Sequence, residues 1–260
     1  MTRRLAAVFA HPDDDTYGVG GTVGLHADAG IEVTAVLATS GDAGRIFDPS
    51  LATRQNLGMV RESEDQAAWG ELGVKPALHF LRYRDGRLSR VPRDELVVHI
   101  SELLAAVRPQ VVVTFGPDGI TGHEDHIAIG EAATAGFHRA RERSPEKGFA
   151  RLLYVAIPQS RLDRLNTLLR ERGAEPMDPT QTFVPHGVPD ESIAVMVDCS
   201  PVYRRKLEAL RQHKTQGELE DVPYELWPEV LGWEAFVMAW PERALGDPVL
   251  ADMFEGLPDA

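Results

Sequence analysis

Short apolar runs alternate with helix-like segments along almost the whole chain, and this order constrains the fold more than any other feature. The runs predicted as strands are Leu5–Ala10, Ile31–Ala38, Ala77–Leu81, Gln110–Phe115, Leu152–Ile157, Ile193–Val197 and Ala235–Trp240. The segments predicted as helices are Gly18–Ala29, Gln55–Leu72, Arg93–Val107, His123–Arg143, Arg161–Arg172 and Val202–Lys214. This alternation predicts an α/β fold, Rossmann-like, with a mainly parallel sheet and helices on both faces. Ligands of such folds bind at the carboxyl ends of the strands.

The length of the chain fits one large domain. It has 260 residues, and no internal repeat divides it. Four prolines fall within Gly173–Pro189, so this stretch is predicted to be a long loop. We therefore expect a single domain over residues 1–260, with a C-terminal elaboration from about residue 174.

Charge and composition exclude several classes of partner. The net charge is −13, and so acidic a surface repels phosphate backbones, so no nucleic-acid partner is expected. No apolar run approaches the ~20 residues of a membrane span, and Leu5–Ala10 is too short for the core of a signal peptide. The single cysteine, Cys199, fits a reducing compartment, so a cytoplasmic location is expected.

A cluster of polar residues, His11-Pro12-Asp13-Asp14, directly follows the first predicted strand. Adjacent residues of a turning segment point in different directions, so one carboxylate can bind a metal while its neighbour faces a water. Two carboxylates this close also favour a neutralising cation. The alternative is an acidic turn that caps the next helix. Since such a turn would not need His11, the metal site is the favoured interpretation.

A second cluster, Thr121-Gly122-His123-Glu124-Asp125-His126, lies a few residues after the strand Gln110–Phe115. Thr121 followed by Glu124 matches a capping box, which predicts a helix start there. His123 and His126 would then lie on one side of the first turn and could reach a common centre. The alternative is a pair of surface histidines in an ordinary first turn.

The two clusters together support a single metal site more strongly than either does alone. Neighbouring central strands of a doubly wound sheet deliver their carboxyl-end loops to one crevice. Three ligands of the histidine and carboxylate type, with one open position, are the pattern of catalytic zinc.

Taken together, these motifs resemble the LmbE/PIG-L family of zinc-dependent N-deacetylases. The resemblance rests on Ala10-His11-Pro12-Asp13-Asp14, on Gly20-Gly21-Thr22, on Thr39 to Gly44, on Arg61 and Glu64, on Tyr83 to Gly86, on Gly122 to His126, and on Lys206 to Gln216. It implies that His11, Asp14 and His126 bind Zn²⁺. It also implies that Asp13 is the general base and that His123 stabilises the oxyanion or serves as the acid. Arg61 and Asp85 match positions that contact the substrate.

Three positions differ from the family pattern. Asp15 replaces a glutamate, Glu124 replaces a proline, and Thr121 stands where some relatives have a tyrosine. The first two do not fall on a ligand, whereas the third bears on substrate preference and rate. His213 continues an apolar helical stripe, so it is expected in the core or at the cleft, with the structural role slightly favoured.

The function expected from the resemblance is removal of an N-acetyl group from an N-acetylglucosaminyl-type small molecule, such as a sugar precursor of a low-molecular-weight thiol. One alternative is an amidase acting on a larger thiol conjugate. Another is a non-catalytic Rossmann-like protein whose metal is structural. A homo-oligomer is left open by the resemblance.

Overall fold

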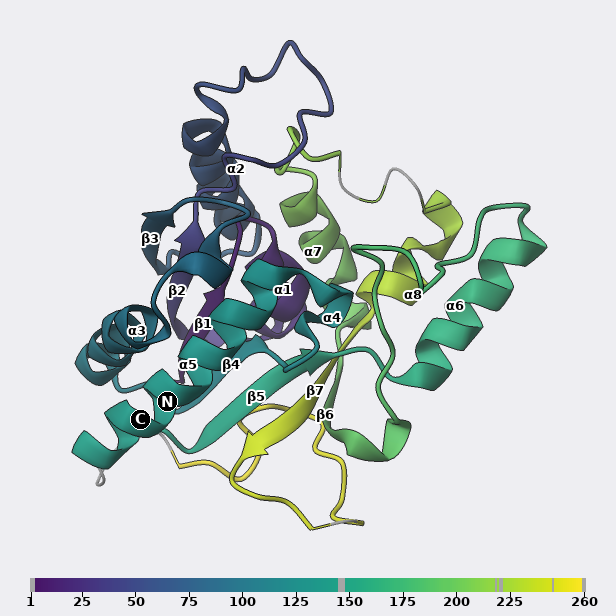
Figure 1. The fold of residues 1–260 in the computed structure, drawn as a ribbon. Helices are drawn as coiled ribbons and strands as arrows, with labels where there is room; N and C mark the ends of the chain where they lie inside the picture. The colour runs from purple at the N-terminus through teal and green to yellow at the C-terminus, as the bar shows by residue number, and fades with distance from the viewer. Residues whose placement is uncertain (1–2, 145–147, 218, 220–221, 245, 259–260) are drawn as a thin grey trace.

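The computed structural model describes residues 3–144, 148–217, 219, 222–244 and 246–258, so the outermost residues of the predicted domain lie outside the described part. Seven strands form one sheet in the order β3-β2-β1-β4-β5-β7-β6 (Figure 1). Their bounds are β1 Arg4–Phe9, β2 Glu32–Thr39, β3 Ala77–Tyr83, β4 Val111–Phe115, β5 Arg151–Ala156, β6 Ile193–Asp198 and β7 Trp233–Trp240. Every pairing among β1 to β5 is parallel, and β7 runs antiparallel to both of its neighbours. The predicted mainly parallel α/β fold is confirmed.

Helices cover both faces of this sheet (Figure 1). On one face α3 and α5 pack on each other, and α5 contacts β1 and β4. On the other face α7 packs on α1 and α2, and α1 contacts β1. The helix bounds are α1 Asp14–His26, α2 Leu57–Glu71, α3 Arg93–Val107, α4 Gly119–Gly122, α5 Glu124–Arg143, α6 Gln159–Glu171, α7 Tyr203–Leu210 and α8 Trp227–Leu231. Among the described residues, no helix combines the length and the apolar character needed to cross a membrane.

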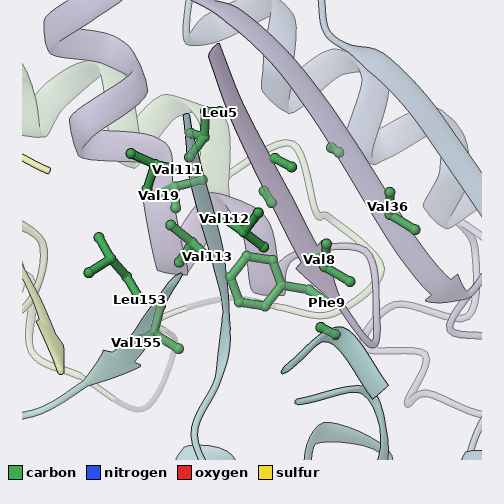
Figure 2. Close-up of a cluster of buried hydrophobic side chains, with 14 of the residues drawn as sticks. Leu5, Val8, Phe9, Val19, Val36, Val111, Val112, Val113, Leu153 and Val155 are labelled. Atoms are coloured by element: carbon green, nitrogen blue, oxygen red, sulfur yellow. The ribbon is translucent and has the colours of Figure 1, made fainter. Parts of the chain in front are cut away.

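The core lies where β1 and β4 meet the helices (Figure 2). All five residues of β4 are buried, and Val111, Val112 and Val113 are fully inaccessible. Phe9 at the end of β1 packs edge-on against Phe115 at the end of β4, with ring centroids 5.0 Å apart. Strands buried on both faces are expected to be continuously apolar, which explains these sequences. The polar residues that follow β1 and β4 are therefore held on a rigid base.

At the two polar clusters, the helix starts differ from the predicted ones. α1 begins at Asp14 instead of Gly18, so the cluster after β1 leads straight into a helix. α5 begins at Glu124, and its N-cap is His123, whose side chain accepts a hydrogen bond from the Asp125 backbone N–H. The predicted capping box from Thr121 is therefore wrong. Thr121 belongs to the short preceding helix α4, where Ile120 has a positive φ of 62° and turns the chain before α5 starts.

A buried ion pair secures the middle of α1. Lys206 Nζ lies 2.7 Å from Glu234 Oε1 and also donates to the Tyr17 carbonyl at 2.7 Å. Glu234 accepts from the Gly21 N–H at 2.6 Å. Glycine is needed at Gly21, because a Cβ there would lie 2.4 Å from Cys199 Sγ. Through these contacts β7 and α7 fix the position of α1, whose first turn carries Asp14.

Candidate metal and catalytic site

The two polar clusters meet at the carboxyl ends of β1 and β4, which are adjacent parallel strands. His126 Nε2 lies 3.3 Å from His11 Nδ1, although the two residues are 115 positions apart. Asp14 lies between them: its Oδ2 is 3.4 Å from His11 Nδ1, and its Oδ1 is 3.5 Å from His126 Nε2. The three residues implied as metal ligands are therefore brought together.

The spacing of these donors suits zinc. Ligand atoms at ~2.0–2.2 Å from a tetrahedral zinc lie roughly 3.3–3.6 Å from one another. His126 is oriented for this task, since its Nδ1 lies 3.0 Å from the Gly119 carbonyl and its ring stacks on Phe115. That contact leaves Nε2 facing the centre, since a hydrogen bond at one ring nitrogen of a metal-binding histidine orients the other nitrogen toward the metal. His11, His123 and His126 also form a group of potential ligands, so the residues present fit a metal ion.

A second group of acids lies on the opposite edge of His11. His11 Nε2 is 3.1 Å from Asp85 Oδ1 and 3.5 Å from Asp125 Oδ2. Asp85 is buried and accepts a hydrogen bond from the Ala43 N–H at 2.8 Å. Burial opposes its ionisation, but the hydrogen bond and charge of His11 hold the pKa of Asp85 at about 2. An acid on the far edge of a ligating imidazole fixes the ring and its tautomer.

Asp125 was missed by the sequence reasoning, although it lies inside the second motif. It is fully buried, and its carboxylate accepts from the Gly86 N–H at 2.7 Å and from the Leu88 N–H at 2.9 Å. A charged residue on the first turn of an amphipathic helix is normally read as solvent-exposed. In the sequence, only its position two residues after His123 could have indicated that Asp125 belongs to the site.

His123 lies beside His11 and His126, with one ring nitrogen available as a hydrogen-bond donor. Its ring centroid lies 4.9 Å from that of His11 and 4.8 Å from that of His126. Its Nδ1 accepts from the Asp125 N–H at 3.1 Å, so the proton of the neutral imidazole is on Nε2. Burial lowers the pKa of His123, and the neighbouring His11 and His126 lower it further, which favours that neutral form. A neutral imidazole with an Nε2–H can stabilise a developing oxyanion.

Asp13 stands beside the ligand group and is held by Arg61. Arg61 NH2 donates to Asp13 Oδ2 at 2.7 Å and to the Pro12 carbonyl at 2.5 Å. Only 3% of Arg61 is exposed, and its NH1 donates to the Gly41 carbonyl at 3.1 Å. Arg61 was expected to contact substrate, but the structure places it beneath the loop that begins at Gly41. Asp85, expected to do the same, faces His11.

The remaining positions of interest have structural partners. His213 is buried, and its Nε2 lies 3.1 Å from Thr16 Oγ1. Asp15 is buried and accepts from the Trp69 indole at 2.8 Å, whereas Glu124 is exposed and accepts from Ser89. Thr121 is half-buried in α4.

Comparison with known proteins bears on this arrangement. The family described as "PIG-L: GlcNAc-PI de-N-acetylase" matches residues 6–137. A 1D-myo-inositol 2-acetamido-2-deoxy-alpha-D-glucopyranoside deacetylase from Geodermatophilus obscurus is 33% identical over 99% of each chain. The N,N'-diacetylchitobiose deacetylase of Pyrococcus horikoshii superposes with a TM-score of 0.60 at 23% identity, over 91% of this chain and 83% of that one. GalB, a 4-carboxy-2-hydroxymuconate hydratase from Pseudomonas putida, superposes with a TM-score of 0.62 at 15% identity, over 95% of this chain and 99% of that one.

The last comparison shows that the fold alone hosts more than one chemistry. The fold, the cluster at the ends of β1 and β4, and the relatives over the full length together define an enzyme of the amide-hydrolysing deacetylase class. Within that class, the chain belongs to the PIG-L family.

Proposed function

We propose that the protein is a zinc-dependent deacetylase that removes the N-acetyl group from an N-acetylglucosaminyl small molecule. The named activity of its full-length relatives, deacetylation of an inositol glycoside of N-acetylglucosamine, supports this substrate type. A sugar of this kind could be a precursor of a low-molecular-weight thiol. The cytoplasmic location expected from the single cysteine stays a prediction.

His11, Asp14 and His126 would hold the ion. Bound there, zinc would supply a Lewis acid for the acetyl carbonyl and lower the pKa of a water towards ~7. Asp13 is not one of the three ligands in this proposal, and its carboxylate would take the proton of the attacking water. His123 would donate from Nε2 to the carbonyl oxygen as negative charge develops. Asp13, which then carries the proton taken from the water, would pass it to the departing amine.

One observation carries this proposal: a carboxylate stands beside a complete ligand set without being needed for it. His11, Asp14 and His126 already approach one another within 3.3–3.5 Å, and Asp13 is separately held by Arg61. A structural metal site has no use for a spare base. The arrangement therefore favours catalysis over a non-catalytic metal-binding role.

The test is an acetate-release assay on the zinc-loaded protein, with free amine as the second readout. The substrates are the inositol glycoside of N-acetylglucosamine and a thiol conjugate that carries a larger amide. We expect stoichiometric acetate and amine from the glycoside, and release of both ~10²–10⁴-fold more slowly from an Asp13→Asn control. Cleavage of the larger amide alone would favour the amidase alternative. A zinc-loaded protein that cleaves neither would overturn the proposal.

A further inference from the structure

One stripe of α2 is polar although it is buried. Arg61, Asp65 and Trp69 follow one another at intervals of four residues, so they lie on one side of this helix. All three are almost wholly inaccessible to solvent. Arg61 contacts Asp13, and the other two side chains contact Asp15. α2 therefore holds both of the residues that flank the aspartate among the candidate metal ligands.

Asp15 is a fully buried carboxylate, and each of its oxygens has an N–H donor. Its Oδ1 accepts from the Thr16 backbone N–H and its Oδ2 from the Trp69 indole N–H, both at 2.8 Å. Two N–H donors favour the ionised form of a carboxyl group. Asp15 is therefore the acceptor in its contacts with α2.

Asp65 differs from Asp15, because no N–H or O–H group of the described residues donates to it. Both of its oxygens are buried, and its side chain is in hydrogen-bonding contact with the carboxylate of Asp15. The Arg61 guanidinium, one turn away on α2, is already paired with Asp13. Burial raises the pKa of Asp65 well above its ordinary value, and the charge of Asp15 raises it further. A carboxyl group that faces a carboxylate can form a hydrogen bond with it only in its protonated form, as the donor.

The turn that Asp15 anchors is strained at the candidate base. Asp13 is the N-cap of α1, with a φ of 114°, and its side chain makes no capping hydrogen bond. Such a conformation persists only where the surrounding contacts fix it. Arg61 fixes the Asp13 side chain, and the contacts of Asp15 fix the first turn of the helix directly after it. A shift of ~1 Å at a catalytic group can lower a rate ~10²-fold, so these anchors bear on the reaction.

We propose that Asp65 is a positioning residue: as a neutral carboxylic acid it donates a hydrogen bond to Asp15 and so holds the turn that carries the candidate base and a metal ligand. In this form it adds no charge beside Arg61, so the charge of the guanidinium is left to Asp13. An ionised Asp65 would instead repel Asp15 and compete for the guanidinium. This inference rests on the proposed deacetylase function, because it gives the turn a role in that reaction.

The test compares two substitutions of similar size in the zinc-loaded full chain, with acetate release from the best glycoside as the assay. Asp65→Asn has no charge and keeps a donor toward Asp15, so kcat, KM and zinc content should stay at the wild-type values. Asp65→Leu has no donor, so kcat should fall ~10-fold or more while KM and zinc content are kept. A purely structural role would change only the urea midpoint, so wild-type kcat in both variants would overturn the inference. A loss of kcat in Asp65→Asn as large as that in Asp65→Leu would do the same, because it would show that the carboxylate itself is needed.

Infrared spectroscopy tests the protonation of Asp65 without any assay of activity and without the leucine variant. At neutral pH the wild type should show the C=O band of a protonated carboxyl group, and Asp65→Asn should lack it. A wild-type spectrum without this band would overturn the inference.

The matched control is Asp28, an exposed aspartate that follows α1 at the end opposite to the site. Asp28→Asn and Asp28→Leu should change neither kcat nor the infrared band, and an effect equal to that at Asp65 would contradict a specific role. If the wild type releases no acetate, the proposed function is refuted, and the infrared band still decides whether Asp65 is a neutral donor.

Discussion

The Arg61 guanidinium lies 2.7 Å from the Asp13 carboxylate and is almost wholly buried, so it forms an ion pair with the candidate base from inside the protein. Asp13 has a positive φ of 114°, a conformation that is strained for a residue with a side chain. Two further bonds, to the carbonyls of Pro12 and Gly41, fix the guanidinium. Arg61 therefore orients Asp13 and offsets the strain.

Replacement of Arg61 tests this role. We expect Arg61→Ala to keep its zinc and its KM while kcat falls at least ~10-fold, because Asp13 loses the partner that orients it. Arg61→Lys should be intermediate, since it keeps the charge without the fork. Steady-state kinetics on the best glycoside measure both parameters. A higher KM with unchanged kcat would restore the role expected from the family resemblance, direct contact with substrate.

A substitution at Asp13 tests whether Asp14 is the metal ligand and Asp13 the general base. Asn is nearly isosteric but does not accept the proton of the attacking water. Asp13→Asn should therefore retain zinc and lose ~10²–10⁴ in kcat, the usual contribution of a positioned general base. Metal analysis and single-turnover rates give the two readouts. An Asp13→Asn protein that is purified without metal would show that Asp13 is a ligand.

Metal content tests the ligand set. Asp14→Ala and His126→Ala each remove one of three donors that lie within 3.5 Å of one another, so both should lose most of their zinc. His123→Ala serves as the control, because it should keep the metal and lose rate through weaker oxyanion stabilisation. Zinc is measured after dialysis against a weak chelator. Full occupancy in the two ligand variants would mean that the metal binds elsewhere.

Two glycines provide a matched test of packing around α1. A Cβ on Gly21 would meet Cys199 Sγ at 2.4 Å and Glu234 Oε1 at 3.0 Å, whereas a Cβ on Gly70 in α2 would meet nothing within 4 Å. Gly21→Ala should destabilise the fold by ~1–3 kcal/mol through overpacking. Gly70→Ala should be neutral or stabilise by up to ~1 kcal/mol, since alanine favours a helix. The free energy of unfolding of both variants is measured in urea. Equal changes in the two variants would contradict the close approach at Gly21.

Stability should fall in mild acid because of His213. Burial lowers the pKa of this imidazole to about 3, and the nearby charge of Arg61 acts in the same direction. Below the ordinary pKa of ~6.5, the His213 imidazole binds a proton in the unfolded chain but not in the folded chain. Stability is therefore lost as the pH falls from ~6.5 towards 3. The slope is at most ~1.4 kcal/mol per pH unit. Urea unfolding of metal-free His213→Gln should show a shallower slope than the wild type, and equal slopes would refute this account.

The residue pattern by itself determined the layers of the fold and predicted that the two polar clusters meet at one end of the sheet. Apolar runs such as Val111 to Val113 are local signals, and a strand buried on both faces has few other sequences available. His11 and Asp14 are three residues apart, and His126 follows a second strand, so the carboxyl-end rule for parallel sheets was enough to predict that they meet.

Only the tertiary structure decided how the surrounding side chains are used. The Asp125 carboxylate turned inward to His11, and Arg61 was buried under the loop that begins at Gly41. The antiparallel strand β7 also inserted between β5 and β6, where it brings Glu234 to α1. These outcomes depend on contacts between residues far apart in the chain. A polar side chain at a helix start has the same local sequence whether it faces water or a buried partner, so its direction is set by what packs against it.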